Sequence, residues 1–220
     1  MSELSKETPL HYYSLGRELL ETLADVEDEV VHNYQYGTIQ QKALATVSLL
    51  QFDLFSSFLL LLQPEQKGPI VGRAVILRTI MENYGTALHI KSNEKRSKAY
   101  LLHANNIRKQ IKIQLEGAIM PESEKAWSTS TITHRISLID EKGAVRMYDS
   151  LSNFTHGNNM LYLLDNKEVT EAYIKGVNSY YIGMFIGFLS EMAIGLDLKL
   201  EKRKKIFAAI KSVGEQGKKK

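Results

Sequence analysis

The chain of 220 residues lacks several features that mark large classes of proteins. It contains no cysteine, which excludes disulfides, thiolate nucleophiles and cysteine-ligated zinc. It also has no glycine-rich phosphate loop, no dinucleotide-binding fingerprint, no HExxH zinc motif and no serine nucleophile elbow. The sequence therefore argues against thiol chemistry and against the enzyme classes that depend on those four motifs.

Signals for export and membrane insertion are missing as well. The first ten residues lack the basic start and the continuous apolar run of a signal peptide. The longest apolar stretch, residues 180–196, is only 17 residues long and contains Glu191. The other apolar stretch, residues 49–63, includes Gln51 and Asp53. We therefore expect a cytoplasmic protein that does not cross a membrane.

What is present is an ordinary globular composition with an uneven charge distribution. Hydrophobic residues make up 44% of the chain and charged residues 24%, which is typical of one folded domain. The net charge is +3, but residues 198–220 carry +7 and residues 1–197 carry −4. We predict a helical bundle domain over residues 1–198 and a basic C-terminal extension over residues 199–220. Such a tail is either simply solvated or attracts an anionic partner such as nucleic acid or a lipid surface.

Apolar residues recur at helical spacing almost throughout, and no segment alternates as a half-buried strand does. This pattern predicts an all-α protein, a single up-and-down helical bundle of about seven helices. We expect long helices over residues 8–37, 38–63, 69–90, 94–117 and 167–196, and another between Gly143 and Gly157. The Pro-, Ser- and Thr-rich segment 120–133 is predicted to be a loop.

Small residues line one face of the last long helix: Gly176, Ser179, Gly183, Gly187 and Ser190. A glycine inside a helix costs roughly 1 kcal/mol relative to alanine, so close packing against another backbone should offset that cost. The packing partner is either the core or a second copy of the chain. We expect a homodimer, formed through this face or through the helix that contains His156.

Two of the predicted helices carry polar side chains that can form one site. In the helix over residues 69–90, Arg78 and Glu82 are four residues apart and share a face. In the sequence YDSLSNFTHG at residues 148–157, hydroxyl and imidazole groups share one helix face: Tyr148, Ser152, Thr155 and His156. Because buried hydroxyls need partners, we expect the two sets to meet.

Three interpretations of this constellation stay open. As a catalytic site, it uses His156 as the general acid or base and Arg78 to stabilise a phosphate, with Glu82 orienting the arginine. As a structural network, the same residues satisfy one another inside a non-enzymatic interaction or regulatory module. As a pocket, the space between the two helices takes a small ligand.

A divalent cation is the only cofactor that these residues suggest, and no ligand spacing supports it specifically. The groups that would bind it are two acids and two histidines: Glu82, Asp149, His89 and His156. Contacts to the phosphate backbone of a nucleic acid are predicted for five basic side chains: Lys98, Lys109, Lys112, Lys202 and Arg203. Few aromatic residues lie among them, so we expect non-specific, salt-sensitive binding without base stacking.

These motifs resemble those of a bacterial family of helical proteins of unknown function. Its pattern is R-x-x-x-E followed by Y-x-x-L-S-x-x-x-H, matched here by Arg78 with Glu82 and by residues 148–156, with Tyr100 and the isolated Trp127 between them. The match covers roughly residues 40–196. That family is in turn similar to the HEPN superfamily, whose members are all-helical, often dimeric, and include many ribonucleases. The resemblance implies nucleic-acid processing.

The sequence departs from the HEPN pattern at one position. HEPN nucleases carry an arginine five to seven residues before the histidine and cut RNA without metal. Here those positions are Asp149, Ser150 and Leu151, and the nearest preceding arginine is ten residues before His156. We therefore predict a ribonuclease or general nuclease in which Arg78 supplies the arginine from the neighbouring helix, or else a site without HEPN chemistry.

Overall fold

The computed structural model describes residues 4–63, 70–91, 93–115, 131–155 and 167–218, and over these ranges its regular structure is entirely helical. The helices are α1 (Leu4–Ala24), α2 (Glu27–Tyr36), α3 (Ile39–Leu61), α4 (Ile70–Lys91), α5 (Glu94–Leu115), α6 (Ile132–Ser137), α7 (Gly143–Thr155), α9 (Lys167–Gly195) and α10 (Leu200–Lys218). The prediction of an all-α helical bundle is confirmed, although the described ranges hold nine helices rather than about seven.

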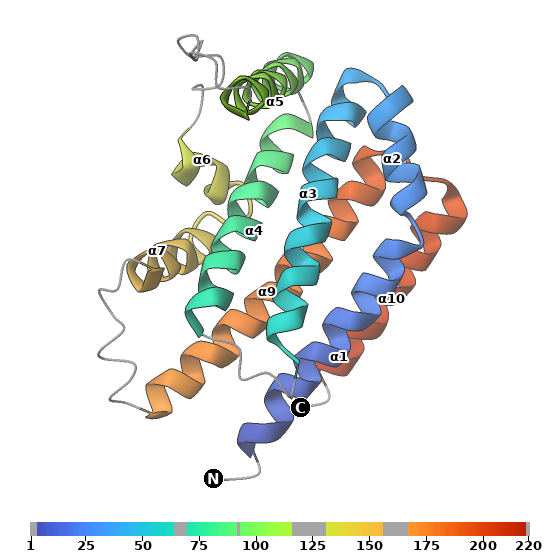
Figure 1. Ribbon diagram of the computed structural model, residues 1–220. Coiled ribbons are helices and arrows are strands. Elements are labelled where there is room, and N and C mark those ends of the chain that lie inside the picture. The colour runs from blue at the N-terminus through green and yellow to red at the C-terminus, as the bar shows by residue number, and fades with distance from the viewer. Residues whose placement is uncertain (1–3, 64–69, 92, 116–130, 156–166, 219–220) are drawn as a thin grey trace.

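Three long helices, α3, α4 and α9, form the centre of the bundle and contact one another in every pairing (Figure 1). On one flank α1 and α10 lie side by side, and α2 packs against α3. On the opposite flank α6 and α7 both pack against α4, while α5 crosses one end of α3 and α4. The two helices predicted to carry the polar constellation, α4 and α7, are therefore direct neighbours.

Side-chain caps mark where two of the helices begin. The hydroxyl of Thr38 accepts a hydrogen bond from the Gln41 N–H (3.2 Å), and the Gln41 side chain accepts one from the Thr38 N–H (2.8 Å). Thr131 caps α6 by accepting from the His134 N–H at 3.2 Å. The predicted loop over residues 120–133 thus gives way to a helix at Ile132, and residues 120–130 lie outside the described ones.

The helix predicted over residues 8–37 is two helices in the structure, α1 and α2. At their junction the Val26 N–H bonds to the Leu23 carbonyl at 3.0 Å, three residues back rather than four, and this tighter bond turns the chain. Val26 is fully buried at the turn. The apolar periodicity therefore continues through the break, which is why the sequence pattern predicted one helix.

Stacked aromatic rings fill the core where α3 crosses α9. Phe55 stacks on Phe185 with ring centroids 3.8 Å apart, and Phe58 stacks on Tyr181 at 4.1 Å. The Tyr181 hydroxyl donates to the Phe55 carbonyl at 2.9 Å, so this buried polar group has a partner. Full burial of side chains of this size stabilises a fold by about 1.5–3 kcal/mol each, so these four rings contribute substantially to the stability of the bundle.

One helix of the described residues, α3, is long and apolar enough to cross a membrane by length and composition, and half of its most apolar window is buried in the bundle. Its buried Gln51 makes polar contacts with α4. The Asn83 side-chain amide donates to Gln51 Oε1 at 2.7 Å and to the Val47 carbonyl at 3.1 Å, and Gln51 Nε2 donates to the Ile80 carbonyl at 3.3 Å. These bonds fix α3 and α4 in register, because a slip of either helix would leave buried amides unpaired.

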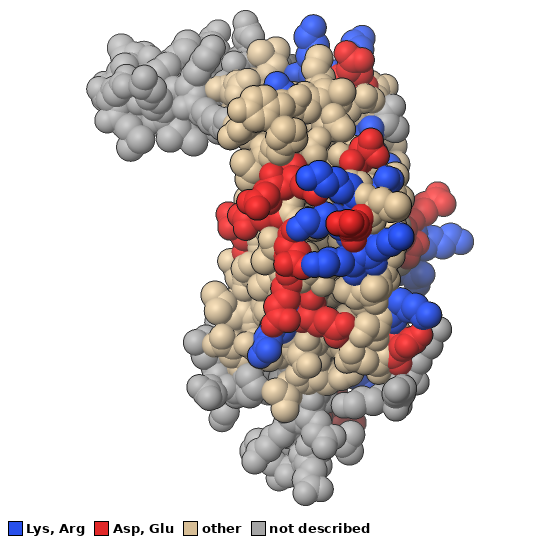
Figure 2. Space-filling model, turned by 90° about the vertical axis from the view of Figure 1, so that its right-hand side faces the viewer, with Lys and Arg blue, Asp and Glu red and all other residues tan. Residues whose placement is uncertain are grey.

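The segment predicted as a basic extension forms α10, which packs along α1 and against α9. Its Ile206 and Val213 are buried. Its basic side chains pair with acidic groups of neighbouring segments: Lys199 with Glu29 (3.9 Å), Lys205 with Asp25 (3.0 Å) and Arg203 with Asp197 (3.7 Å). Basic and acidic side chains accordingly alternate over this face of the molecule (Figure 2). Much of the positive charge of this segment is thus neutralised by acidic side chains of the same molecule.

Candidate functional site

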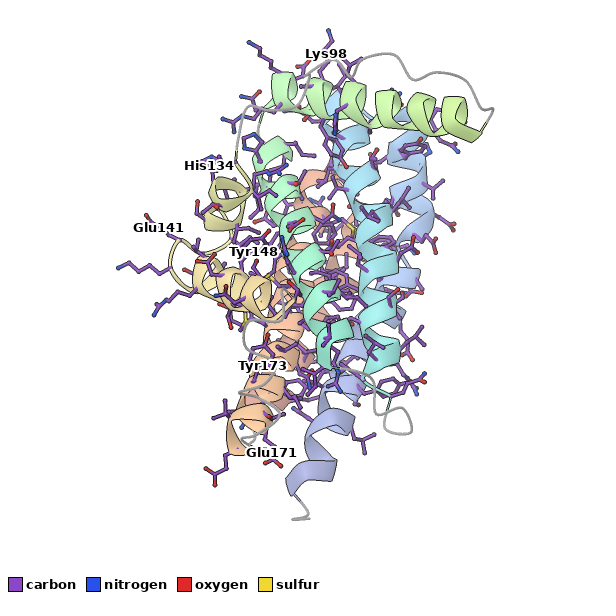
Figure 3. The ribbon with its side chains drawn as sticks, turned by 60° about the vertical axis from the view of Figure 1, so that its left-hand side comes forward. Lys98, His134, Glu141, Tyr148, Glu171 and Tyr173 are labelled. Atoms are coloured by element: carbon purple, nitrogen blue, oxygen red, sulfur yellow. The ribbon has the colours of Figure 1, made fainter. Side chains whose placement is uncertain are left out.

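The candidate site lies where α7 crosses α4. The apolar face of α7 is buried against the bundle through Ala144 and Leu151, and this packing directs Tyr148 between the two helices (Figure 3). Tyr148 is 8% exposed. Arg78 and Glu82 of α4 keep 28% and 32% of their side-chain surface exposed. A buried phenol therefore meets an ion pair that still reaches solvent.

Four side chains from the two helices form one hydrogen-bonded network. The Tyr148 hydroxyl donates to Glu82 Oε1 at 2.5 Å, and Arg78 Nε donates to the same carboxylate oxygen at 3.2 Å and to the Tyr148 oxygen at 3.3 Å. Arg78 Nη1 donates to the Thr155 hydroxyl at 3.4 Å. The Arg78 guanidinium carbon also lies 5.2 Å from the centre of the Tyr148 ring. The guanidinium is held from both helices.

The network keeps Arg78 charged and Tyr148 protonated. The hydrogen bond to Tyr148 and the charge of Glu82 raise the pKa of Arg78 above its ordinary value, against the opposing effect of burial. Burial and the hydrogen bond to Glu82 raise the pKa of the Tyr148 phenol. The pair of Arg78 and Glu82 is neutral as a whole, so any anion that binds here must compete with the Glu82 carboxylate.

The arrangement still leaves Arg78 able to bind an anion. Its Nε–H is used by Glu82 and Tyr148, and its Nη1 makes only the long contact to Thr155. No hydrogen bond from the described residues occupies Nη2. A guanidinium with terminal N–H groups to spare and an orientation fixed at Nε can bind a phosphate oxygen without losing its anchors.

Ser152 and His156 complete the face predicted for this helix. Thr155 donates to the Ser152 carbonyl at 3.0 Å. The Ser152 hydroxyl is buried and has no hydrogen-bond partner among the described residues. His156 and Gly157 lie outside the described residues, which end in this region at Thr155. The structure therefore brings Arg78, Glu82, Tyr148 and Thr155 together.

The basic residues predicted to hold a nucleic-acid strand lie on other parts of the molecule. Lys98 is exposed on α5, at the far end of the bundle from Tyr148 (Figure 3). Lys109 and Lys112 also belong to α5, but their side chains are outside the described ones. Lys202 and Arg203 are on α10, on the opposite flank from α7, where they contact the Asp25 carbonyl and Asp197. The described side chains of Lys98, Lys202 and Arg203 do not converge on Arg78.

The other predicted metal ligands are also dispersed. His89 is buried near the end of α4, where its ring meets the His134 ring of α6 edge to face at 5.9 Å. Asp149 is exposed on α7. Within the ranges that the structure describes, no group of three or more His, Asp or Glu side chains is close enough to hold a metal ion.

No family model, curated protein or solved structure matches this chain.

Sequence reasoning missed a second group of polar residues, Tyr84, Asp140 and Tyr180, which line one groove beside α9. Tyr84 follows the apolar periodicity of α4, which indicates a core position, and its side chain is only 7% exposed. Asp140 lies in the turn before α7, where periodicity carries no information. The small residues of α9 were the one sequence signal for this groove.

Proposed function

We propose that this chain is a nucleic-acid-processing protein and that Arg78 binds a phosphate group of its substrate. The observation that supports this most directly is the pair of hydrogen bonds that the Arg78 guanidinium donates to the hydroxyls of Tyr148 and Thr155. Both hydroxyls come from α7, whose sequence continues directly into His156. A fixed guanidinium can stabilise the charge on a phosphoryl group, and an imidazole can act as the general acid and base of metal-free phosphodiester cleavage.

Glu82 and Tyr148 act as positioning residues in this proposal. Both bind Arg78 at Nε, which leaves the terminal nitrogens for the phosphate oxygens. Glu82 also neutralises the arginine in the absence of substrate. A phosphate therefore binds to a guanidinium whose orientation is already fixed and whose charge is shared with Glu82. The Ser152 hydroxyl, which is buried and lacks a partner among the described residues, is a further donor on the same helix.

For an RNA substrate the reaction is an intramolecular transfer. The ribose 2′-oxygen attacks the adjacent phosphorus, the bond from phosphorus to the 5′-oxygen breaks, and a cyclic phosphate and a 5′-hydroxyl result. His156 takes the proton from the 2′-hydroxyl, and the leaving 5′-oxygen takes up a proton from the imidazolium. Arg78 stabilises the negative charge that builds on the phosphoryl oxygens. DNA lacks the 2′-hydroxyl and would not be cut by this route.

A non-enzymatic role is favoured by one specific observation. The charges of Arg78 and Glu82 cancel, and the Tyr148 hydroxyl is fully used by the two of them. A neutral, mutually satisfied network of this kind also serves to fasten α7 to α4 in a helical interaction or regulatory module. The two functions differ in whether removal of Arg78 abolishes an activity or only lowers stability.

Cleavage of labelled single-stranded RNA and DNA by the purified protein separates these possibilities. Wild type, Arg78→Ala and His156→Ala are assayed with and without a chelator, and the circular dichroism of each variant is recorded to verify intact helices. The proposal expects RNA cleavage that resists the chelator and falls at least 100-fold in both variants. Cleavage that persists in both variants would mean contamination and would refute the catalytic role.

The chain contains its own matched control, the pair of Arg17 and Glu21 on α1. This pair has the same R-x-x-x-E spacing and a similar Nε to Oε1 distance of 2.9 Å, but both side chains are about two-thirds exposed. Arg17→Ala removes the same charge from a surface without Tyr148 or Thr155. The proposal expects this variant to cleave RNA at the wild-type rate. Equal losses in Arg17→Ala and Arg78→Ala would indicate a general charge effect and contradict a specific phosphate site.

A further inference from the structure

A second candidate site is a groove of about 410 Å³ on the flank of the bundle that carries α7, remote from the paired charges of α10. It runs along α9 and is bounded by α4, by the turn between α6 and α7, and by the start of α7. The residues that matter for recognition are Tyr84, Asp140, Ser179, Tyr180, Gly183 and Met184. Its volume lies in the range of small-molecule sites in proteins.

Tyr84 is a largely buried residue that lines this groove. The side chain is 7% exposed, and within the described part of the chain its hydroxyl has no hydrogen-bond partner. A Cβ atom on Gly187 would lie 2.8 Å from this hydroxyl oxygen, so the phenol reaches the backbone of α9 only because residue 187 is glycine. Burial, with a smaller effect of Glu191, raises the pKa of Tyr84 to about 12. The phenol is thus protonated at neutral pH.

At the other side of the groove a carboxylate and a second phenol lie close together. A Cβ atom on Gly143 would clash with Asp140 Oδ2 and would lie 3.1 Å from the Tyr180 hydroxyl oxygen. Asp140 uses its other oxygen, Oδ1, to accept a hydrogen bond from the Lys142 N–H at 3.2 Å. Oδ2 is left for a ligand, and no described basic side chain forms an ion pair with Asp140.

The charges around the groove favour a cation. Asp140 lines it directly, and Glu191 acts on the Tyr84 phenol from the side. Glu191 is paired with Lys91, so its charge is largely matched. Arg146 is the one basic group that acts on Tyr180, and its Nε is engaged by the Lys142 carbonyl at 3.2 Å. The carboxylate of Asp140 is therefore the dominant unpaired charge at the groove.

We propose that this groove binds a small organic amine in its protonated form, with the ammonium group against Asp140 and the Tyr180 hydroxyl. The apolar part of the amine lies over Met184 and the glycine surface of α9, and the Tyr84 hydroxyl is free to bond a further polar group of the ligand. This site is separate from Arg78 and does not depend on the proposed nuclease function.

The glycines of α9 explain why the groove is open and supply a way to close it. A Cβ atom on Gly183 or on Gly176 would have nothing within 4 Å. Gly183 lines the groove, whereas Gly176 lies on the same helix outside its lining. Leucine at either position should be tolerated, because there is space for it and because leucine is a better helix former than glycine. Only Gly183→Leu should fill the groove.

Titration of the full chain by NMR with three probes of one shape tests the proposal. The probes are 2-phenylethylamine, 2-phenylethanol and phenylacetate, which carry a cation, a neutral hydroxyl and an anion on the same body. We expect the amine to bind at least tenfold more tightly than the other two. Asp140→Asn and Gly183→Leu should each weaken amine binding at least tenfold. Asp149→Asn, which removes an exposed charge of α7 outside the groove, and Gly176→Leu should leave it unchanged.

Three results would overturn the proposal. One is equal affinity, or no measurable binding, for all three probes. Another is amine affinity that is unchanged in Asp140→Asn or that falls equally in Asp149→Asn. The third is a stable dimer that excludes the amine and is dispersed by Gly183→Leu in sedimentation, since the groove would then be covered by a second copy of the chain.

Discussion

The Tyr148 hydroxyl donates a 2.5 Å hydrogen bond to Glu82 Oε1 across the contact between α7 and α4, joining residues 66 positions apart in the chain. The same carboxylate oxygen receives the Arg78 Nε–H. One oxygen thus couples the orientation of the arginine to the placement of α7. Any change that frees this oxygen should alter both the stability of the bundle and the behaviour of Arg78.

A double-mutant cycle measures this coupling. Tyr148→Phe keeps the buried ring and removes only the hydroxyl. Glu82→Gln removes the negative charge of the group that accepts the hydrogen bond from this hydroxyl. Hydrogen bonds to charged groups contribute about 1.5–3 kcal/mol, so we expect each single variant to lower the free energy of unfolding and the double variant to show a coupling of about 1 kcal/mol or more. Chemical denaturation supplies the four values. Strictly additive effects would show that the two groups do not interact in solution.

Asn178 of α9 is a second buried polar residue, and its environment allows us to predict how its replacement changes the free energy of unfolding. It is fully buried, and neither its amide nitrogen nor its amide oxygen has a hydrogen-bond partner among the described residues. An uncompensated buried amide costs roughly 1–3 kcal/mol, and leucine has a similar size. Asn178→Leu should therefore raise the free energy of unfolding by about 1 kcal/mol or more.

The matched control is Asn83, a buried asparagine of α4 that bonds to Gln51 and to the Val47 carbonyl. Asn83→Leu should destabilise the protein, because it leaves the Gln51 amide oxygen buried without its donor. Opposite signs for Asn178→Leu and Asn83→Leu in the same denaturation experiment are the expected result. A loss of stability in Asn178→Leu would mean that the amide is compensated.

His89 should make the fold sensitive to mild acid. Burial, with the nearby charges of Arg96, His134 and Arg135, lowers the pKa of His89 below its ordinary value. The unfolded chain therefore binds the His89 proton more readily than the folded chain does. The contribution of neutral His89 to the free energy of unfolding is fully present above a pH of about 6.5. It should be lost as the pH falls from that value towards the lowered pKa of the folded state.

Melting temperatures of wild type and His89→Gln between pH 8 and pH 5 test this direction. The variant cannot titrate at this position, so its melting temperature should fall less over the same range, whatever its value at pH 8. His32→Gln, at an exposed position of α2, serves as the control and should follow the wild-type pH dependence. Parallel curves for wild type and His89→Gln would contradict the prediction.

Apolar periodicity predicts the long helices of this chain but not the turns between them. The helices predicted over residues 69–90 and 167–196 match α4 (Ile70–Lys91) and α9 (Lys167–Gly195) closely, because each has a continuous apolar face ended by glycine or polar residues. The break at Val26 was missed because a buried residue at the turn keeps the apolar pattern intact. The loop predicted over residues 120–133 extends two residues into α6, because the cap at Thr131 was not recognised from the sequence.

For the site, shared helix faces predicted which residues could meet but not how they would bond. The spacing of Arg78 with Glu82 and of Tyr148 with Thr155 placed each pair on one face, and the structure joins the two pairs. That Glu82 and Tyr148 both use Nε depends on the crossing of α4 and α7, which no local pattern encodes. The groove beside α9 was unpredictable for the same reason, since Asp140 and Tyr84 are brought together only by tertiary packing.

Binding to a non-cleavable RNA tests most directly whether Arg78 is a phosphate ligand. Fluorescence anisotropy with a 2′-O-methyl RNA oligonucleotide gives the Kd of wild type, Arg78→Ala and Arg17→Ala at one fixed salt concentration. A charge-assisted hydrogen bond of about 1.5–3 kcal/mol corresponds to roughly a 10- to 150-fold change in Kd. The account predicts a loss of at least tenfold for Arg78→Ala and less than twofold for Arg17→Ala. Equal Kd values for wild type and Arg78→Ala, or equal losses in the two variants, would contradict it.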